Sequence, residues 1–422
     1  MSQATAEQTA GTPAAEAPAH FSASHRELTD ALNLAAIAVP PRPPVPTLGG
    51  VVAHTQGRTV TLSAYDYEVT VSVTVPADTA TTGRSVLDYD EFKKSLAAAV
   101  AGETKAAVAA TVVTVDGEQL STAQVSVPVT SYPPQEYPSL PPTAPPVVTV
   151  DGPEFFRQLA RVLPAAGRDD TLPALTTVCL TLSGGSLRMA TTDRYRLTLA
   201  EIPAQPWDAD SDVAAAEQAT AALVPRSVLA LVAKYLGKYT GPIGVGIRHE
   251  GPFPLVALTI GTADITIRMY EGDFPPADNY LPTKRHNAVT LGRASIAKAA
   301  KKAQALTKAK GITAGTACIQ WDDEGGVTLA PYYGEEEQAK VRGAKVDAEI
   351  TDGPPEHVHG RVLAINARFL LDALDAFTGD TVTLHLPPDN AGQYVKPVLF
   401  TEGDAITGDG YRHLVHPLRL SK

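Results

Sequence analysis

Two aspartates in similar polar turns are the first candidates for chemistry in this sequence. Asp66 lies in TLSAYDYEVTVSVTVPA (61–77) and Asp193 in MATTDRYRLTLAEIP (189–203), each between two runs of alternating apolar residues. Two carboxylates brought together could act as general acid and base. Asp also stabilises turns through local hydrogen bonds, and equivalent residues of a repeated segment are more simply two copies of one structural turn. The pattern therefore predicts two hairpins, the second with its charged tip at residues 192–194.

Other familiar catalytic or ligand-binding patterns are absent from the sequence. It has no Walker-type phosphate loop, no G-x-S-x-G, no H-E-x-x-H and no C-x-x-C. The stretch HVHG (357–360) offers two histidines to a metal, but no further ligands stand at suitable spacing, which favours a surface loop. Cys179 and Cys318 lie in apolar runs and are predicted to be buried strand residues in equivalent positions. We expect no cofactor, no metal and no catalytic activity.

Composition indicates a globular protein. The 422 residues are 44% hydrophobic and 19% charged, with a formal net charge of −11. An acidic balance argues against a generic nucleic-acid binder, because phosphates are attracted to basic surfaces. No apolar run reaches the length of about 18 residues that marks a membrane span. Residues 1–22 lack the basic start and apolar core of a signal peptide, so we expect a disordered tail there and a cytoplasmic protein.

The chain repeats itself along its length. A chain this long fits roughly three domains at about 150 residues each. The segments SYPPQEYPSLP (131–141) and MYEGDFPPADNYLP (269–282) both place an aromatic–Pro pair after an acidic residue and end in Leu-Pro. After the tail, we therefore predict three domains, at 23–147, 148–282 and 283–422.

Each predicted domain carries two helical segments among Val- and Thr-rich strands. Apolar spacing predicts the first helix of each domain at 24–39, 151–167 and 292–310, and the second at 88–100, 225–239 and 366–379. Asp88, Pro225 and Asn366 fit the starts of the second helices. The expected fold class is α+β, with three copies of a unit in which antiparallel sheets carry two helices on one side.

Basic residues recur on these helices although the whole chain is acidic. In the segment 292–310, Lys298, Lys301 and Lys302 lie largely on one helical face, opposite Ile296 and Ala300. For one helix alone, a solvated charged face is the simpler interpretation. Recurrence in successive repeats favours a single basic surface lined by helices. Such a surface would contact a polyanion without reading bases, since contacts to phosphate carry no sequence information.

The order and spacing of several longer motifs resemble one known family. These motifs run from about His25 to Leu420 and comprise VPPRPPVPTLGGV, AYDYEVTV, EYPSLP, GRDDTLPALTTV, ATTDRYRL, EGDFPPADNYLP and YRHLVHPLRL. Together they resemble the bacterial DNA polymerase III β subunit, the sliding clamp, and most closely its actinobacterial members. The resemblance implies three clamp domains per chain and a head-to-tail homodimeric ring, with sheets outside and helices inside around double-stranded DNA.

The same resemblance implies where partners bind. In the family, the turn of the middle domain and the C-terminal tail grip short linear motifs of the polymerase catalytic subunit and of other clients. Carried over, the client pocket comprises Leu172, Thr192, Arg194, Tyr195, Arg196, Leu197, Pro225, Leu229, Leu414, His416, Pro417 and Leu418. The implied DNA-facing residues are Arg42, Lys93, Arg157, Arg161, Arg168, Lys234, Lys298, Lys301, Lys302 and Arg368. The implied dimer contacts are Val125 and Val127 against Ala305 and Leu306.

The resemblance implies a processivity factor of DNA replication that an ATP-dependent clamp loader places on DNA. The family usually has Met at the position of His416, and bulkier apolar residues at Val125 and Val127. One alternative is a second, specialised clamp that resists an inhibitor or serves a restricted set of polymerases. Another is an acidic, β-rich hydrolase, which would need a catalytic cluster that the sequence does not offer.

Overall fold

The computed structural model describes residues 17–208, 220–313, 315–388 and 396–420. They form two units, one running to Thr143 together with Gly261–Thr266, the other comprising Ala144–Ile260 and the chain from Ile267 onward. The predicted first domain, 23–147, overlaps the first unit, which also includes Gly261–Thr266 of the predicted middle domain. The predicted third domain and the rest of the predicted middle domain lie in the second unit, where strands of both pair in one sheet.

The first unit holds two antiparallel groups of strands and three helices. A five-stranded sheet has the order β5-β1-β7-β8-β9, which leaves β9 at an edge. The strands are β1 (His20–Ser24), β2 (Gly50–Gln56), β3 (Thr59–Tyr65), β4 (Val69–Pro76), β5 (Asp78–Thr79), β6 (Gly83–Asp88), β7 (Val112–Asp116), β8 (Gln119–Ser121), β9 (Ser126–Pro128) and β10 (Ser131–Tyr132). The helices are α1 (His25–Ala35), α2 (Tyr89–Ala99) and the short α3 (Lys105–Ala110).

The predicted disordered tail ends too late in the sequence. Residues 20–22 belong to strand β1, which pairs with β7. Phe21 is fully buried there, and this burial of a large apolar side chain offsets the entropy lost when the strand orders. Residues 1–16 lie outside the described part of the chain.

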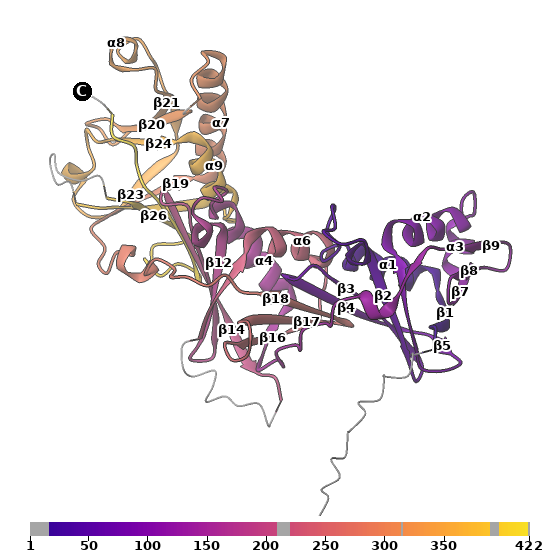
Figure 1. Cartoon of the computed structure of the whole chain (residues 1–422). Helices are drawn as coiled ribbons and strands as arrows, with labels where there is room; N and C mark the ends of the chain where they lie inside the picture. Colours follow the sequence, from indigo (N-terminus) through magenta and orange to yellow (C-terminus); the bar gives the residue numbers. More distant parts are fainter. Residues whose placement is uncertain (1–16, 209–219, 314, 389–395, 421–422) are drawn as a thin grey trace, which may run out of the picture. The chain divides into compact units, whose positions relative to one another are not determined.

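In the middle domain, two helices cover one face of antiparallel strands (Figure 1). Asp151 starts the first helix, because its side chain accepts a hydrogen bond from the Glu154 backbone N–H. The helices are α4 (Gly152–Val162) and α6 (Arg226–Leu236). The strands are β11 (Val148–Asp151), β12 (Thr177–Ser183), β13 (Ser186–Thr192), β14 (Arg196–Pro206), β15 (Thr220–Pro225), β16 (Pro242–Arg248), β17 (Leu255–Ile260) and β18 (Ala263–Arg268).

The third domain repeats this plan and adds a short helix. Its long helix buries Ile296, Ala300 and Ala303 and packs against the second helix. The helices are α7 (Arg293–Ala309), α8 (Glu335–Gln338) and α9 (Ala367–Asp375). The strands are β19 (Asn287–Gly292), β20 (Thr316–Trp321), β21 (Val327–Pro331), β22 (Ala344–Val346), β23 (Ala348–Asp352), β24 (Val362–Asn366), β25 (Thr381–Leu386), β26 (Val398–Thr401) and β27 (Tyr411–Val415).

The two aspartate turns are copies of one structure, as predicted. Asp66 Oδ1 accepts hydrogen bonds from the backbone N–H groups of Glu68 and Val69, at 3.0 and 2.7 Å. Asp193 Oδ1 accepts the equivalent bonds from residues 195 and 196, at 3.0 and 2.8 Å. Tyr67 and Arg194 follow the aspartates with φ of 74° and 77°, and no other non-glycine residue of the described chain has a positive φ. In each domain, the carboxylate thus stabilises a turn whose next residue has a left-handed backbone conformation.

Candidate functional site

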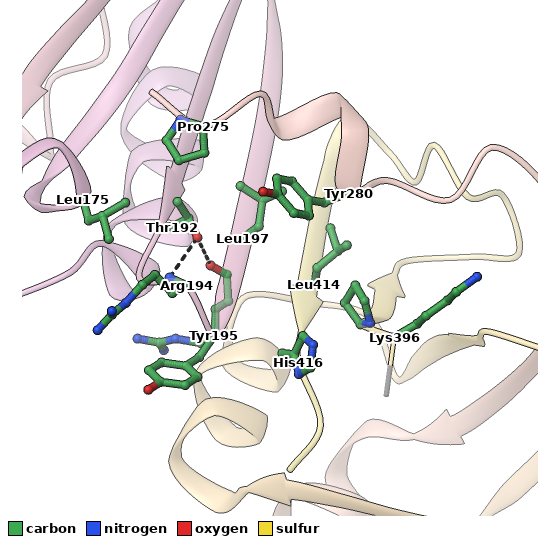
Figure 2. Close-up of a pocket in the computed structure, with 12 residues that line it drawn as sticks. Leu175, Thr192, Arg194, Tyr195, Leu197, Pro275, Tyr280, Lys396, Leu414 and His416 are labelled. Atoms are coloured by element: carbon green, nitrogen blue, oxygen red, sulfur yellow. Dashed lines mark hydrogen bonds between the residues drawn. The ribbon is translucent and has the colours of Figure 1, made fainter. Parts of the chain in front are cut away.

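The second of these turns forms one wall of a cavity. Thr192 Oγ1 donates a hydrogen bond of 2.5 Å to the Arg196 carbonyl and accepts one of 3.2 Å from the Arg194 backbone N–H (Figure 2). Together with the bonds to Asp193, these contacts close the hairpin tightly. The turn therefore presents the exposed side chains of Arg194 and Tyr195 in defined positions.

Arg196 fastens this hairpin to the third domain. Its buried guanidinium donates to Asp193 at 2.9 Å and, on helix α9, to Asp372 at 2.6 Å. It also lies over the Phe369 ring, 4.2 Å from the ring centroid. Tyr195 stacks on the same ring, with centroids 6.2 Å apart. The hairpin of the middle domain forms one wall of the cavity. Helix α9 of the third domain thus supports this wall from behind through Asp372 and Phe369.

The C-terminal strand completes the arrangement. Strand β14 pairs antiparallel with β27, so that Leu197 lies opposite Leu414. Beyond the strand, the His416 backbone N–H donates a 2.8 Å hydrogen bond to the Tyr195 carbonyl. Because the ladder and this bond fix the register, the tail runs directly beside the turn.

Between hairpin and tail lies a cavity of about 410 Å³. Its walls are largely apolar, with a few polar groups that could orient a ligand, as peptide anchor sites require (Figure 2). The predicted residues that line it are Thr192, Arg194, Tyr195, Arg196, Leu197, Leu414 and His416. Residues that sequence reasoning did not assign also line it: Leu175, Pro275, Tyr280, Lys396 and Pro397. Three of these lie in motifs already noted, GRDDTLPALTTV and EGDFPPADNYLP, whereas Lys396 carried no signal.

A second cavity of about 270 Å³ adjoins the first across the Arg194–Tyr195 turn. It contains the predicted pocket residue Leu172 and two predicted DNA-facing residues, Arg168 and Arg368. Four other predicted pocket residues line neither cavity: Pro225, Leu229, Pro417 and Leu418. Leu229 is fully buried in the core, and the Leu418 N–H is bonded to the Ala364 carbonyl. The assignment of these four residues to the client pocket stays a prediction.

The basic face predicted for residues 292–310 exists on helix α7. Lys298, Lys301 and Lys302 are exposed and line an open groove together with Ala294, Ala297 and Ala305. The small alanines leave the lysine stems accessible to a bulky polyanion. Five more predicted DNA-facing residues are exposed: Arg42, Arg157, Arg168, Lys234 and Arg368. Lys93 is half-buried, with Nζ donating to the Tyr89 hydroxyl at 2.9 Å.

Arg161 does not face solvent, which corrects its prediction as a DNA-facing residue. Its side chain is only 6% exposed and forms a 3.5 Å ion pair with Asp409. The guanidinium lies 3.9 Å from the ring centroid of Tyr411, whose hydroxyl donates to the Arg161 carbonyl. Burial lowers the pKa of Arg161, which Asp409 and the neighbouring ring partly oppose. The arginine thus joins α4 to strand β27 inside the second unit.

The residues predicted to form a dimer contact are accessible. Val127 lies on the edge strand β9, and Val125 precedes it with its side chain exposed. Ala305 and Leu306 are exposed near the end of helix α7. An edge strand with unpaired backbone groups is suited to pairing with another chain.

No group of three or more potential metal ligands occurs among the residues that the structure describes. Within the same residues, no helix is long and apolar enough to cross a bilayer. Cys179 and Cys318 are buried at the third position of β12 and β20, as predicted for equivalent strand residues.

Comparisons with known proteins agree with this architecture. Models of the N-terminal and central domains of the DNA polymerase III β subunit match residues 19–141 and 149–276. A β sliding clamp of Streptomyces coelicolor is 28% identical over 399 residues, covering 93% of this chain and 97% of that protein. A β sliding clamp of Micrococcus luteus is 29% identical over 323 residues, covering 76% of this chain and 96% of the relative.

A solved structure has the same fold. The crystal structure of a sliding clamp from Pseudomonas aeruginosa bound to griselimycin superposes with a TM-score of 0.77 at 20% identity, and the match covers 96% of this chain and 100% of that chain. The two matched domain models together span more than half of the sequence, so this chain belongs to the family of the DNA polymerase III β subunit, the bacterial sliding clamps.

Proposed function

We propose that this protein encircles duplex DNA as a homodimeric ring and holds short linear motifs of its clients in the 410 Å³ cavity. Membership in the family gives the coarser function, that of a non-catalytic clamp that confers processivity on DNA polymerase III. The ring contacts, the DNA-facing residues and the client pocket are the finer parts of the proposal.

One observation carries the pocket assignment. The cavity lies where the Thr192–Leu197 hairpin of one domain meets the C-terminal strand of another, and both walls are fixed by backbone pairing. A preformed apolar cavity with few polar groups lets an extended peptide bind without a large ordering cost in the protein. An accessible side chain such as Tyr280 adds contact area at the rim.

The charge distribution supports DNA encirclement. The chain is acidic as a whole, yet the groove on α7 is lined by three lysines and no carboxylate. Retention by topology needs only weak phosphate contacts, which permit sliding. The negative charge of the rest of the molecule repels DNA and so reduces unproductive wrapping around the outside of the ring.

We propose that the ring closes through contacts between two different surfaces of the protomer. If β9 of one protomer meets the α7 end of its partner, the contact is heterologous, and two such contacts close a dimer. We further propose that an ATP-dependent loader opens this ring on DNA, and that the protein acts in the cytoplasm.

Deletion of the C-terminal tail, which forms one wall of the cavity, tests the proposed pocket. Residues 416–422 follow strand β27, so their deletion spares the buried ladder that a cut at His413 would destroy. We expect the truncated protein to remain folded, to lose binding of clamp-binding peptides in calorimetry, and to stop stimulating processive primer extension. Peptide affinity equal to that of the full chain would show that the tail is not part of the client site.

A further inference from the structure

The charged side chains that line the cavity between hairpin and tail are all cationic. Its lining includes Arg194, Arg196 and Lys396, and no aspartate or glutamate. This contrasts with a net charge of −11 for the chain. A local positive site on an acidic protein selects among ligands by charge as well as by shape.

Two of these cations already have acidic neighbours. Arg196 is buried and paired with Asp193 and Asp372. Arg194 forms no ion pair among the described residues, but it lines the adjoining cavity together with Asp169, whose carboxylate accepts a hydrogen bond from the Thr171 hydroxyl. Lys396 is exposed and has no ion pair among the described residues. Lys396 is therefore the lining cation that shares neither cavity with a carboxylate of the protein, so a bound ligand can meet its charge without competing with one.

The backbone holds Lys396 at the rim. It precedes Pro397, and a residue before proline is restricted to extended conformations. Val398, which follows Pro397, begins strand β26, and this strand pairs with β27 so that Val398 lies opposite Val415. Continuing that register brings Lys396 and Pro397 alongside the tail at His416. Figure 2 shows Lys396 on the opposite side of the cavity from Arg194, with its ammonium directed away from the apolar interior.

We infer that Lys396 makes this pocket selective for client peptides with a carboxylate beside their apolar anchors. The inference rests on the proposed function of the pocket and specifies the chemistry of its partner. Because the ammonium stands outside the apolar interior, it meets a flanking Asp or Glu rather than an anchor residue. The pair is solvent-exposed, so we expect a preference of about twofold to fivefold, weakened by salt.

The test uses capped octapeptides that share Leu and Phe anchors and carry Asp or its neutral isostere Asn at each flanking position in turn. Calorimetry on the full chain at about 50 mM and about 300 mM NaCl measures the Asp/Asn affinity ratio. At one flanking position, the wild type should bind the Asp peptide more tightly, and more so at low salt. Lys396→Gln should abolish this preference, and Lys396→Glu should reverse it. Lys238→Glu is the matched control, because Lys238 is exposed and lines neither cavity.

Two results would overturn the inference. Equal affinity for Asp and Asn peptides at every position would remove the charge selection, while binding of both peptides would leave the pocket itself established. A preference that survives Lys396→Gln but vanishes in Arg194→Gln would assign the selection to the turn instead. If no peptide binds the wild type at all, the proposed function fails before the question of charge arises.

Discussion

Arg196 and Asp372 join two domains of the second unit through a 2.6 Å hydrogen bond between Nη1 and Oδ2. The arginine belongs to the strand that follows the pocket turn, whereas the aspartate belongs to helix α9. Only 5% of the arginine side chain is exposed, so water cannot replace a lost partner easily. The ion pair therefore links the shape of the client cavity to the packing of the two domains.

We predict that Asp372→Asn will lower the free energy of unfolding by about 1–3 kcal/mol, because a buried guanidinium loses one of its two carboxylates. Peptide affinity should fall by about fivefold, since Tyr195 and Arg194 are held less firmly. Denaturant unfolding and calorimetry measure the two effects. Asp375→Asn, an exposed carboxylate on the same helix, is the control and should change neither. Unaltered peptide affinity in Asp372→Asn would mean that the hairpin holds its shape without α9.

Much of this site follows from local sequence patterns. The repeated aspartate turn was predictable because an Asp side chain bonds backbone N–H groups two and three residues ahead, and both partners are local. The helices were predictable from apolar spacing and from caps such as Asp88 and Asn366, each of which accepts a backbone hydrogen bond. The short helix α3 was missed, since six residues are too few to show a period.

Residues whose role depends on another domain were not predictable. Arg161 has the helical spacing of a surface cation, four residues after Arg157. It is buried because Tyr411 and Phe377, far along the chain, pack against its guanidinium. Lys396 lies in no periodic segment and reaches the pocket only through the pairing of β26 with β27. Such long-range contacts leave no mark on the neighbouring sequence.

Two buried histidines predict a loss of stability in acid. Desolvation lowers the pKa of His413 to about 3 and that of His385 to about 4, from an ordinary 6.5. The His413 ring donates from Nδ1 to the Tyr411 hydroxyl, which itself donates to the Arg161 carbonyl. Its Nε2 has no partner among the described residues, so a second proton there would be an unpaired buried charge.

The direction in which stability changes with pH follows from the number of protons that the folded and the unfolded chain bind. Below pH 6.5 the unfolded chain protonates both rings, whereas the folded chain does not until about pH 4, so stability falls as the pH drops through that window. At pH 5 each histidine contributes about 2 kcal/mol of this loss. Scanning calorimetry in buffers of different ionisation enthalpy should show that His413→Gln and His385→Gln each take up about one proton fewer on unfolding at pH 5. Equal proton uptake in all three proteins would contradict the prediction.

The proposed ring contact predicts a monomeric variant. Val127→Glu combined with Leu306→Glu places like charges on two surfaces that should meet across the protomers, and burying them without partners is costly. Light scattering should then give the mass of one chain instead of two. Val112→Glu is the control, because Val112 is an exposed apolar residue on β7, which is not an edge strand of the same sheet. A double variant that remains dimeric would place the interface elsewhere.

The lysines of α7 predict a change in salt dependence. Replacing Lys298, Lys301 and Lys302 by Ala removes three potential phosphate contacts, so the slope of log affinity against log salt should become shallower by up to about 2.7. Fluorescence anisotropy with linear duplexes of unrelated sequence measures this slope, and the loss should not depend on base sequence. Lys340→Ala, at an exposed lysine beyond α8, should leave the slope unchanged. If the triple variant keeps the wild-type slope, these lysines form an ordinary solvated face.

From the surroundings of His416 we predict that replacing it by Met will raise the affinity of the pocket for a neutral peptide. Its Nδ1 lies 3.0 Å from the Pro417 carbonyl, and because a carbonyl only accepts, this nitrogen carries the proton. In the neutral ring, Nε2 is then an acceptor at the cavity wall, and an apolar anchor that covers it leaves it unpaired. That loss costs about 1–3 kcal/mol, which corresponds to roughly fivefold to hundredfold in affinity. Methionine offers a flexible, polarizable wall without this acceptor.

His416→Met should therefore tighten binding of an uncharged anchor peptide, while His416→Gln, which keeps polar atoms at the site, should not. Both variants leave strand β27 intact, because the residue follows its last paired position at Val415. Calorimetry with one peptide on the three proteins separates the outcomes. Weaker binding by the methionine variant would mean that the peptide itself supplies a donor to Nε2, and that the imidazole recognises its ligand rather than opposing it.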